Sequence, residues 1–200
     1  LVYGTIAFKE NSGFLYIGSS RQLEVTGENC KDVTYASDNE TVASVDENGK
    51  VTAKAAGTAV ITATSAAGKT AQYKLTVKTP SVKMNASAKT LYVKGSPATV
   101  TLKATTAGVT GKVTYTSSKP SVAAVAANGK VTAKAAGTAV ITAKCGNYKT
   151  TCKITVKKPS VKASASAKTV FVGGTSQITV KKTGVSGKVT YTSSNKSVAV

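Results

Sequence analysis

The stretch Asn48 to Ala63 reads NGKVTAKAAGTAVITA, and the same sixteen letters return from Asn128 to Ala143, an offset of 80 residues. Apolar and polar residues alternate on both sides of the Ala55-Ala56-Gly57 connection, which is the period-2 pattern of strands with one buried face. The Asn-Gly pair predicts a tight type I′ hairpin, because both central residues of that turn need positive φ. The stretch therefore predicts a β-sheet protein built from copies of one unit.

The composition favours short strands over helices. Aromatic residues make up 6% of the chain, Trp is absent, and the apolar content is mainly Val and Ala, accompanied by much Thr. At 80 residues per repeat, 200 residues give two complete units and part of a third. We place the boundaries at 1–78, 79–157 and 158–200, with only the opening strands in the last segment.

Each complete unit shows about seven short alternating segments with turn signals between them, which is typical of an immunoglobulin-like sandwich. The predicted fold class is therefore all-β, with tandem immunoglobulin-like β-sandwiches. Tyr35, Tyr115 and Tyr191 take the same place in the central segment of each unit and are predicted core aromatics. The third unit reaches Val200 before its own Asn-Gly hairpin, so we expect its strands to be completed by further chain or by a neighbouring molecule.

A family resemblance rests on three segments that follow one another in both complete units: Val-Thr-Tyr-x-Ser, then Val-Ala-x-Val, then the Asn-Gly stretch. Together they resemble the bacterial immunoglobulin-like group 2 repeat. In that family the central aromatic is commonly Trp, so a tyrosine there leaves a hydroxyl that needs a partner. The resemblance implies tandem modules of bacterial surface proteins and adhesins, of phage virion proteins, or of accessory regions of secreted enzymes.

Charge is distributed unevenly along the chain. All eight acidic residues precede residue 48, where three cations accompany them, while residues 48–200 hold 24 lysines and no acidic residue. One interpretation is that the lysines solubilise outward positions and discourage edge pairing. The other is contact with a polyanionic or glycan surface. The near absence of Arg argues against bidentate, sequence-specific recognition of nucleic acid.

Three cysteines divide into a pair and a single residue. A loop from 146 to 151 would place Cys145 and Cys152 on adjacent antiparallel strands. If both side chains face inward, their Cα atoms come within disulfide range. We therefore predict a disulfide between them, with two buried free thiols as the alternative. Cys30 has no partner in its own unit and is predicted to be an unpaired thiol.

Residues that carry catalytic chemistry are scarce. The chain has no His, so Ser-His-Asp, Cys-His and His-based zinc sites are excluded, and later units lack carboxylates for acid pairs or calcium cages. Asp38, Glu40, Asp46 and Glu47 read as solvated turns rather than a cation site. We expect no catalytic residue, metal or cofactor. At one predicted loop, Tyr148 and Lys149 are a candidate sugar or phosphate contact.

Function follows from these patterns and from the resemblance. We expect a non-catalytic extracellular stalk, fibre or adhesive element of a bacterial surface, with homotypic assembly as a further form of contact. The alternatives are a virion module that attaches weakly to glycans and an accessory region of a secreted enzyme. No apolar run approaches the roughly 18 residues of a membrane helix, so we expect no membrane span in this segment. Because the chain begins at Leu, we expect an earlier segment to have been cut away.

Overall fold

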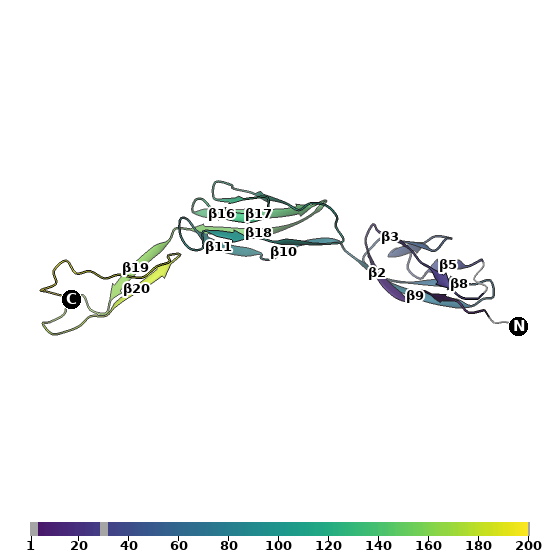
Figure 1. The fold of residues 1–200 in the computed structure, drawn as a ribbon, viewed down its shortest axis with the longest axis horizontal. Coiled ribbons are helices and arrows are strands. Elements are labelled where there is room, and N and C mark those ends of the chain that lie inside the picture. The colour runs from purple at the N-terminus through teal and green to yellow at the C-terminus, as the bar shows by residue number, and fades with distance from the viewer. Residues whose placement is uncertain (1–3, 29–31, 200) are drawn as a thin grey trace. The chain divides into compact units, whose positions relative to one another are not determined.

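The computed structural model describes residues 4–28 and 32–199, and these form strands and turns without a helix. The chain divides into two compact units, Leu1–Ser81 with Ala107–Val109, and Val82–Thr106 with Thr110–Val200. The predicted all-β class and the tandem sandwiches are confirmed (Figure 1). In the described part of the chain, no helix has the length and apolar character that crossing a membrane requires.

The described residues of the first repeat form nine short strands instead of about seven. They are β1 Ala7–Phe8, β2 Ser12–Tyr16, β3 Ser20–Gln22, β4 Val25–Thr26, β5 Thr34–Ser37, β6 Ala43–Val45, β7 Lys50–Ala53, β8 Gly57–Thr64 and β9 Thr70–Lys78. The sheets have the orders β2-β9-β8-β5 and β3-β7-β6, with a separate β1-β4 ribbon. The count exceeds the expectation because two stretches of the chain each divide into two strands with different partners. In the first stretch β1 pairs with β4 and β2 pairs with β9. In the second stretch β3 pairs with β7 and β4 pairs with β1.

The second repeat has the same topology. Its strands are β10 Ser81–Met84, β11 Ala88–Tyr92, β12 Thr99–Thr101, β13 Ala104–Ala107, β14 Thr114–Ser117, β15 Ala123–Val125, β16 Lys130–Ala133, β17 Gly137–Cys145 and β18 Tyr148–Lys157. They form the sheets β11-β18-β17-β14 and β12-β16-β15 and the ribbon β10-β13. In both repeats the last strand lies parallel to an early one, β9 to β2 and β18 to β11, so each sandwich closes only when its final strand is in place.

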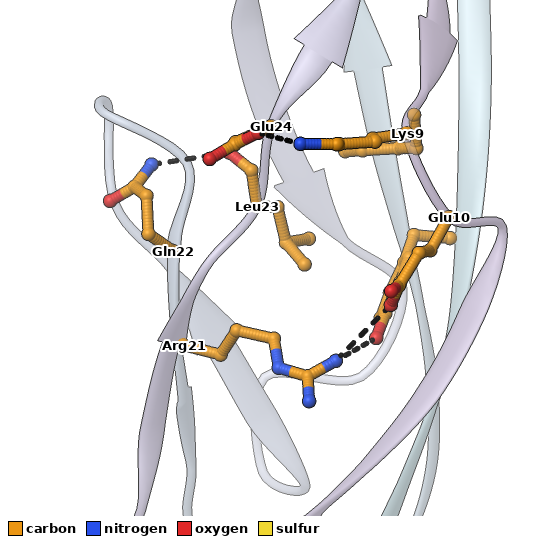
Figure 2. A pocket seen from close by; sticks show the side chains of 8 residues that line it. Lys9, Glu10, Arg21, Gln22, Leu23 and Glu24 are labelled. Carbon is orange, nitrogen blue, oxygen red and sulfur yellow. Dashed lines mark hydrogen bonds and ion pairs between the residues drawn. The ribbon is translucent and has the colours of Figure 1, made fainter.

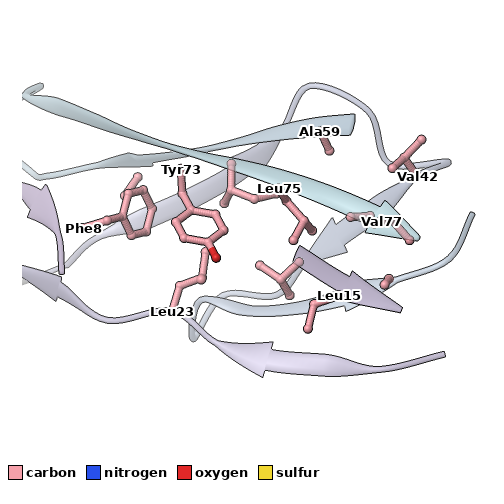
Figure 3. Close-up of a cluster of buried hydrophobic side chains, with 13 residues drawn as sticks. Phe8, Leu15, Leu23, Val42, Ala59, Tyr73, Leu75 and Val77 are labelled. Atoms are coloured by element: carbon pink, nitrogen blue, oxygen red, sulfur yellow. The ribbon is translucent and has the colours of Figure 1, made fainter. Parts of the chain in front are cut away.

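The core of the first repeat lies between its two larger sheets (Figure 3). Alternation along β8 and β9 turns Ala59, Ile61 and Leu75 inward. Tyr73 is the largest fully buried side chain, 1% exposed, and its ring meets Phe8 edge-on with centroids 5.7 Å apart. In the second repeat Ile141 and Ile154 fill the equivalent core, and Cys152 takes the place of Tyr73 opposite the isoleucine.

Two of the three tyrosines predicted as core aromatics lie at the margin of the core. Tyr35 and Tyr115 are half-buried and cover the turn glycines Gly49 and Gly129. The Tyr115 hydroxyl accepts a hydrogen bond from the backbone N–H of Ala104 at 2.9 Å, which supplies the partner that a buried phenol needs. Tyr191 is 61% exposed, so the prediction of a core position is wrong for the third segment.

The Asn-Gly turns join β6 to β7 and β15 to β16 but are not of type I′. Only the glycines have positive φ, 78° at Gly49 and 80° at Gly129, and Gly49 N–H donates to the Asp46 carbonyl at 3.0 Å. This is a type I turn followed by a left-handed glycine. The Asp46 carboxylate stabilises it by accepting from the backbone N–H groups of Asn48 at 3.0 Å and Lys50 at 2.9 Å.

The third segment forms one ribbon, β19 Ser160–Ala165 with β20 Ile178–Thr183. This ribbon corresponds to β10-β13 of the second repeat. Residues 170–172 correspond to the end of β11, which is held by β18, and the described residues after 183 contain no counterpart of β18. Phe171 is accordingly 91% exposed.

Candidate functional site

A pocket of about 270 Å³ opens in the first repeat where the β1-β4 ribbon, β3 and β9 come together (Figure 2). Four charged side chains surround it in two ion pairs. Lys9 Nζ lies 3.2 Å from Glu24 Oε2, and Arg21 Nη1 lies 3.5 Å from Glu10 Oε2. These side chains are largely exposed, and such pairs contribute only about 0 to 1 kcal/mol each to stability. The pocket therefore has a polar mouth with balanced charges.

Tyr73 is the buried polar group at this pocket. Its hydroxyl accepts a hydrogen bond from Arg21 Nη1 at 3.2 Å, and Phe8 packs against its ring. Room for the hydroxyl comes from Gly13 on β2, because a Cβ there would lie 2.0 Å from the Tyr73 hydroxyl oxygen. The absence of a side chain at residue 13 is thus a packing requirement of Tyr73.

The second repeat does not reproduce this cluster. Backbone pairing makes Asn85 and Lys103 the counterparts of Lys9 and Glu24, and Val100 the counterpart of Arg21. Lys89 replaces Gly13, and Cys152 replaces Tyr73. The polar pocket is therefore a feature of one repeat, not of the repeated architecture.

The side chains that line the pocket offer paired charges and hydrogen-bonding groups. Each of the four charges has an opposite charge within 3.5 Å. Tyr73 carries the only hydroxyl among the described residues that line the pocket, and that hydroxyl is held by Arg21. A small polar group in the pocket could accept hydrogen bonds from Lys9 and Arg21 and donate them to Glu10 and Glu24. In the described ranges no cluster of three or more acidic or cysteine side chains could hold a metal ion. Two of the four acidic residues considered for a cation accept backbone hydrogen bonds: Asp46 within its own turn, and Asp38 from the N–H of Val60 on β8.

The predicted disulfide is absent, and this prediction is wrong. Cys145 and Cys152 are both buried free thiols. Both face inward as expected, but β18 begins at Tyr148, after a two-residue turn, instead of after a six-residue loop. Cys145 therefore pairs with Tyr148, and Cys152 pairs with Ile141. Four residue positions separate the two thiols along the hairpin, about 13 Å at 3.3 Å per residue.

The environments of the two thiols differ. Cys145 Sγ lies 3.4 Å from the Gly111 carbonyl oxygen. Burial raises the pKa of the Cys152 thiol, and the nearby Lys89 ammonium opposes that shift with a smaller effect. A raised pKa keeps Cys152 protonated at neutral pH and unreactive as a nucleophile. Cys30 lies outside the described residues.

The loop contact proposed for Tyr148 and Lys149 has a different geometry from the one expected. Both residues belong to β18, where consecutive side chains point to opposite faces. Tyr148 shares the inner face with Cys145, whereas Lys149 is exposed on the outer face opposite Lys144.

Sequence reasoning missed the pocket around Tyr73. Nothing local connects Lys9 with Glu24 or Arg21 with Tyr73, because these contacts depend on which strands pair. Gly13 was the available signal, since a glycine inside a strand often marks close approach of another group.

Two family models match the chain. Residues 5–77 match the bacterial Ig-like domain of group 2, and residues 111–158 match a bacterial Ig-like domain. The chain belongs to the bacterial Ig-like repeat proteins. No curated protein sequence matches it.

Solved structures similar to these bacterial Ig-like repeats come from several sources. The S-layer protein rSbsC(31-844) has a TM-score of 0.43 at 18% identity over 89% of this chain, which spans 36% of that structure. An intimin mutant of EHEC O157:H7 has a TM-score of 0.31 at 28% identity over 36% of this chain and 39% of its own. The I9-I11 tandem of titin has a TM-score of 0.48 at 12% identity, covering 93% of this chain and 83% of its own.

Proposed function

We propose that this chain is a non-catalytic structural or adhesive segment of an extracellular bacterial protein, serving as part of a surface stalk or fibre. The observation that carries the proposal is the repetition of one complete sandwich. In the part of the chain that the structure describes, both full repeats consist of nine strands in the same order with the same parallel closing strand, and both match bacterial Ig-like families. Repeating a sandwich that has its own core lengthens the protein without introducing a catalytic site.

The site chemistry supports a structural role over catalysis. The sequence lacks His and has no carboxylate after Glu47, which leaves repeats two and three without general acids or bases of the usual kinds. Cys152 is buried with a raised pKa, and the ion pairs at the pocket of the first repeat occupy its carboxylates. Homotypic contact between the acidic first 47 residues and the basic remainder is part of this proposal as a means of fibre assembly.

Surface display tests the proposal. Antibodies raised against the 200-residue chain should label intact source cells, and protease added outside should release fragments that carry these repeats. An in-frame deletion of residues 79–157, the second repeat, should shorten the displayed protein while leaving it attached. Labelling only after the cells are permeabilised, or labelling confined to virus particles, would refute a cell-surface stalk. Loss of an enzymatic activity on deletion, with display unchanged, would favour an accessory region of an enzyme.

A further inference from the structure

Four lysines lie on one outer face of the second repeat. Lys144 on β17 and Lys149, Lys153 and Lys157 on β18 are exposed and alternate with buried residues of the same strands, so all four point away from the core. We call these four residues the lysine face. They belong to the four-stranded sheet β11-β18-β17-β14.

Protection of sheet edges does not explain this placement. Lysines that prevent edge-to-edge pairing belong on edge strands, but β17 and β18 are the two central strands of this sheet. The edge strand β14 has no lysine, and the only lysine of the edge strand β11 is Lys89, which pairs with the inward-facing Ile154. The lysines are concentrated where backbone pairing is already complete.

The arrangement also has an energetic cost. Lys144 and Lys149 are directly opposed across the strand pair, and like charges at such positions destabilise a sheet. The first repeat has Thr64 opposite Thr70 at the equivalent place, so the fold does not need a lysine pair there. Because no acidic residue follows Glu47 in the sequence, the second repeat has no carboxylate to neutralise the pair.

Hydroxyl groups accompany the lysines on the same face. Thr142 and Thr151 pair with each other next to Lys144 and Lys149, and Thr138 pairs with Thr155 farther along. Thr116 on β14 extends the first of these rows. The face thus combines compact positive charges with rows of groups that both donate and accept hydrogen bonds.

We propose that the lysine face binds a linear anionic polymer of phosphodiester-linked polyols. Ammonium groups suit phosphates as point charges, and the threonine rows suit the hydroxyls of a polyol. Single-stranded nucleic acid fits less well, because its binding relies on aromatic stacking. Tyr92 pairs with Lys157 at the far end of the row, and Tyr148 points to the other face. This binding goes beyond the proposed structural role and does not depend on it.

The test uses the 200-residue chain and fluorescently labelled poly(glycerol phosphate), with anisotropy titrations at several NaCl concentrations. The variant K144T/K149T gives the second repeat the threonine pair of the first. The matched control K130T/K134T removes two exposed lysines from outside this sheet and makes the same change in net charge. An ion pair at 4 Å in water corresponds to about fivefold in affinity, so K144T/K149T should bind about 25-fold more weakly. Its salt slope should also fall by about 0.7 to 0.9 for each lysine.

The control variant should lose no more than about twofold, as expected for a long-range effect screened by salt. Equal losses in the two variants would overturn the lysine face as the site, as would unchanged binding by K144T/K149T. Tighter binding of oligo-dT than of the polymer at equal salt would overturn the ligand class, and no binding by the original chain would overturn the proposal entirely. Removing the repulsive pair should leave the variant folded, with circular dichroism unchanged. None of these results bears on surface display, which tests the structural role separately.

Discussion

Gly13→Ala should destabilise the first repeat although residue 13 lies in an ordinary strand. Its new Cβ would lie 2.0 Å from the Tyr73 hydroxyl oxygen and 3.2 Å from Tyr73 Cζ. The tyrosine ring cannot withdraw, because it is 1% exposed and packed against Phe8. Overpacking of this kind costs about 1 to 3 kcal/mol.

Two smaller effects modify that figure. Displacing the hydroxyl also breaks its hydrogen bond from Arg21, a loss of about 0.5 to 1.5 kcal/mol. Replacing glycine by alanine also lowers the conformational entropy of the unfolded chain, which stabilises the folded state by about 0.4 to 1 kcal/mol. The steric effect dominates, so the net loss should be about 2 kcal/mol in the free energy of unfolding.

A double-mutant cycle with Tyr73→Phe measures the contact directly. Without the hydroxyl oxygen, the nearest atoms to the new Cβ are the flexible Arg21 Nη1 at 3.0 Å and the ring carbon at 3.2 Å. Alanine at 13 should then cost less than about 0.5 kcal/mol, which gives a coupling of more than about 1 kcal/mol. Guanidinium titrations followed by circular dichroism give the free energies, and hydrogen exchange of β8 and β9 assigns the loss to the first repeat.

The second repeat supplies the control. Lys89 occupies the position of Gly13 and Cys152 that of Tyr73, so Lys89→Ala should change stability by no more than about 0.5 kcal/mol. If Gly13→Ala is as stable as the original chain, or costs the same with phenylalanine at 73, the steric reasoning is wrong.

Three further predictions concern the turns and the buried thiol. Gly129→Ala should destabilise the second repeat by at least about 2 kcal/mol, because φ at this residue is 80° and a Cβ would lie 2.1 Å from the Leu102 carbonyl oxygen. Denaturant titrations measure the loss, and a smaller value would mean that the turn can relax. Asp46→Ala removes an acceptor of two backbone hydrogen bonds and should lower the free energy of unfolding of the first repeat by about 1 kcal/mol. Ala126→Asp introduces such an acceptor at the equivalent turn and should raise the melting temperature of the second repeat. Burial raises the pKa of the Cys152 thiol in the folded chain above its ordinary value of 9.0, so the stability that this thiol contributes is full below pH 9.0 and is lost as pH rises above it. The stability of Cys152→Ala should therefore fall less steeply over that alkaline range. The same thiol should resist maleimide at pH 7.5 until the chain is unfolded, and a linked Cys145–Cys152 peptide in a non-reducing digest would contradict the free-thiol state.

The sequence by itself determined the repeating unit, the strands and the faces of their residues. Alternation in NGKVTAKAAGTAVITA predicted that Ala59 and Ile61 face inward, and both are buried. It also placed Cys145 and Cys152 correctly on inner faces. These properties are local, because successive side chains of a strand point to opposite sides whatever its partner is.

Only the tertiary structure decided which residues oppose one another. The two-residue turn after Cys145 set the register of β17 and β18, separating the cysteines and bringing Lys144 opposite Lys149. Pairing between β1 and β4 brought Lys9 to Glu24, and burial of Tyr73 beside Gly13 came from the parallel approach of β2 to β9. Alternation is unchanged when a strand slides by two residues, so it cannot specify register, which turn length and packing across the sandwich fix instead.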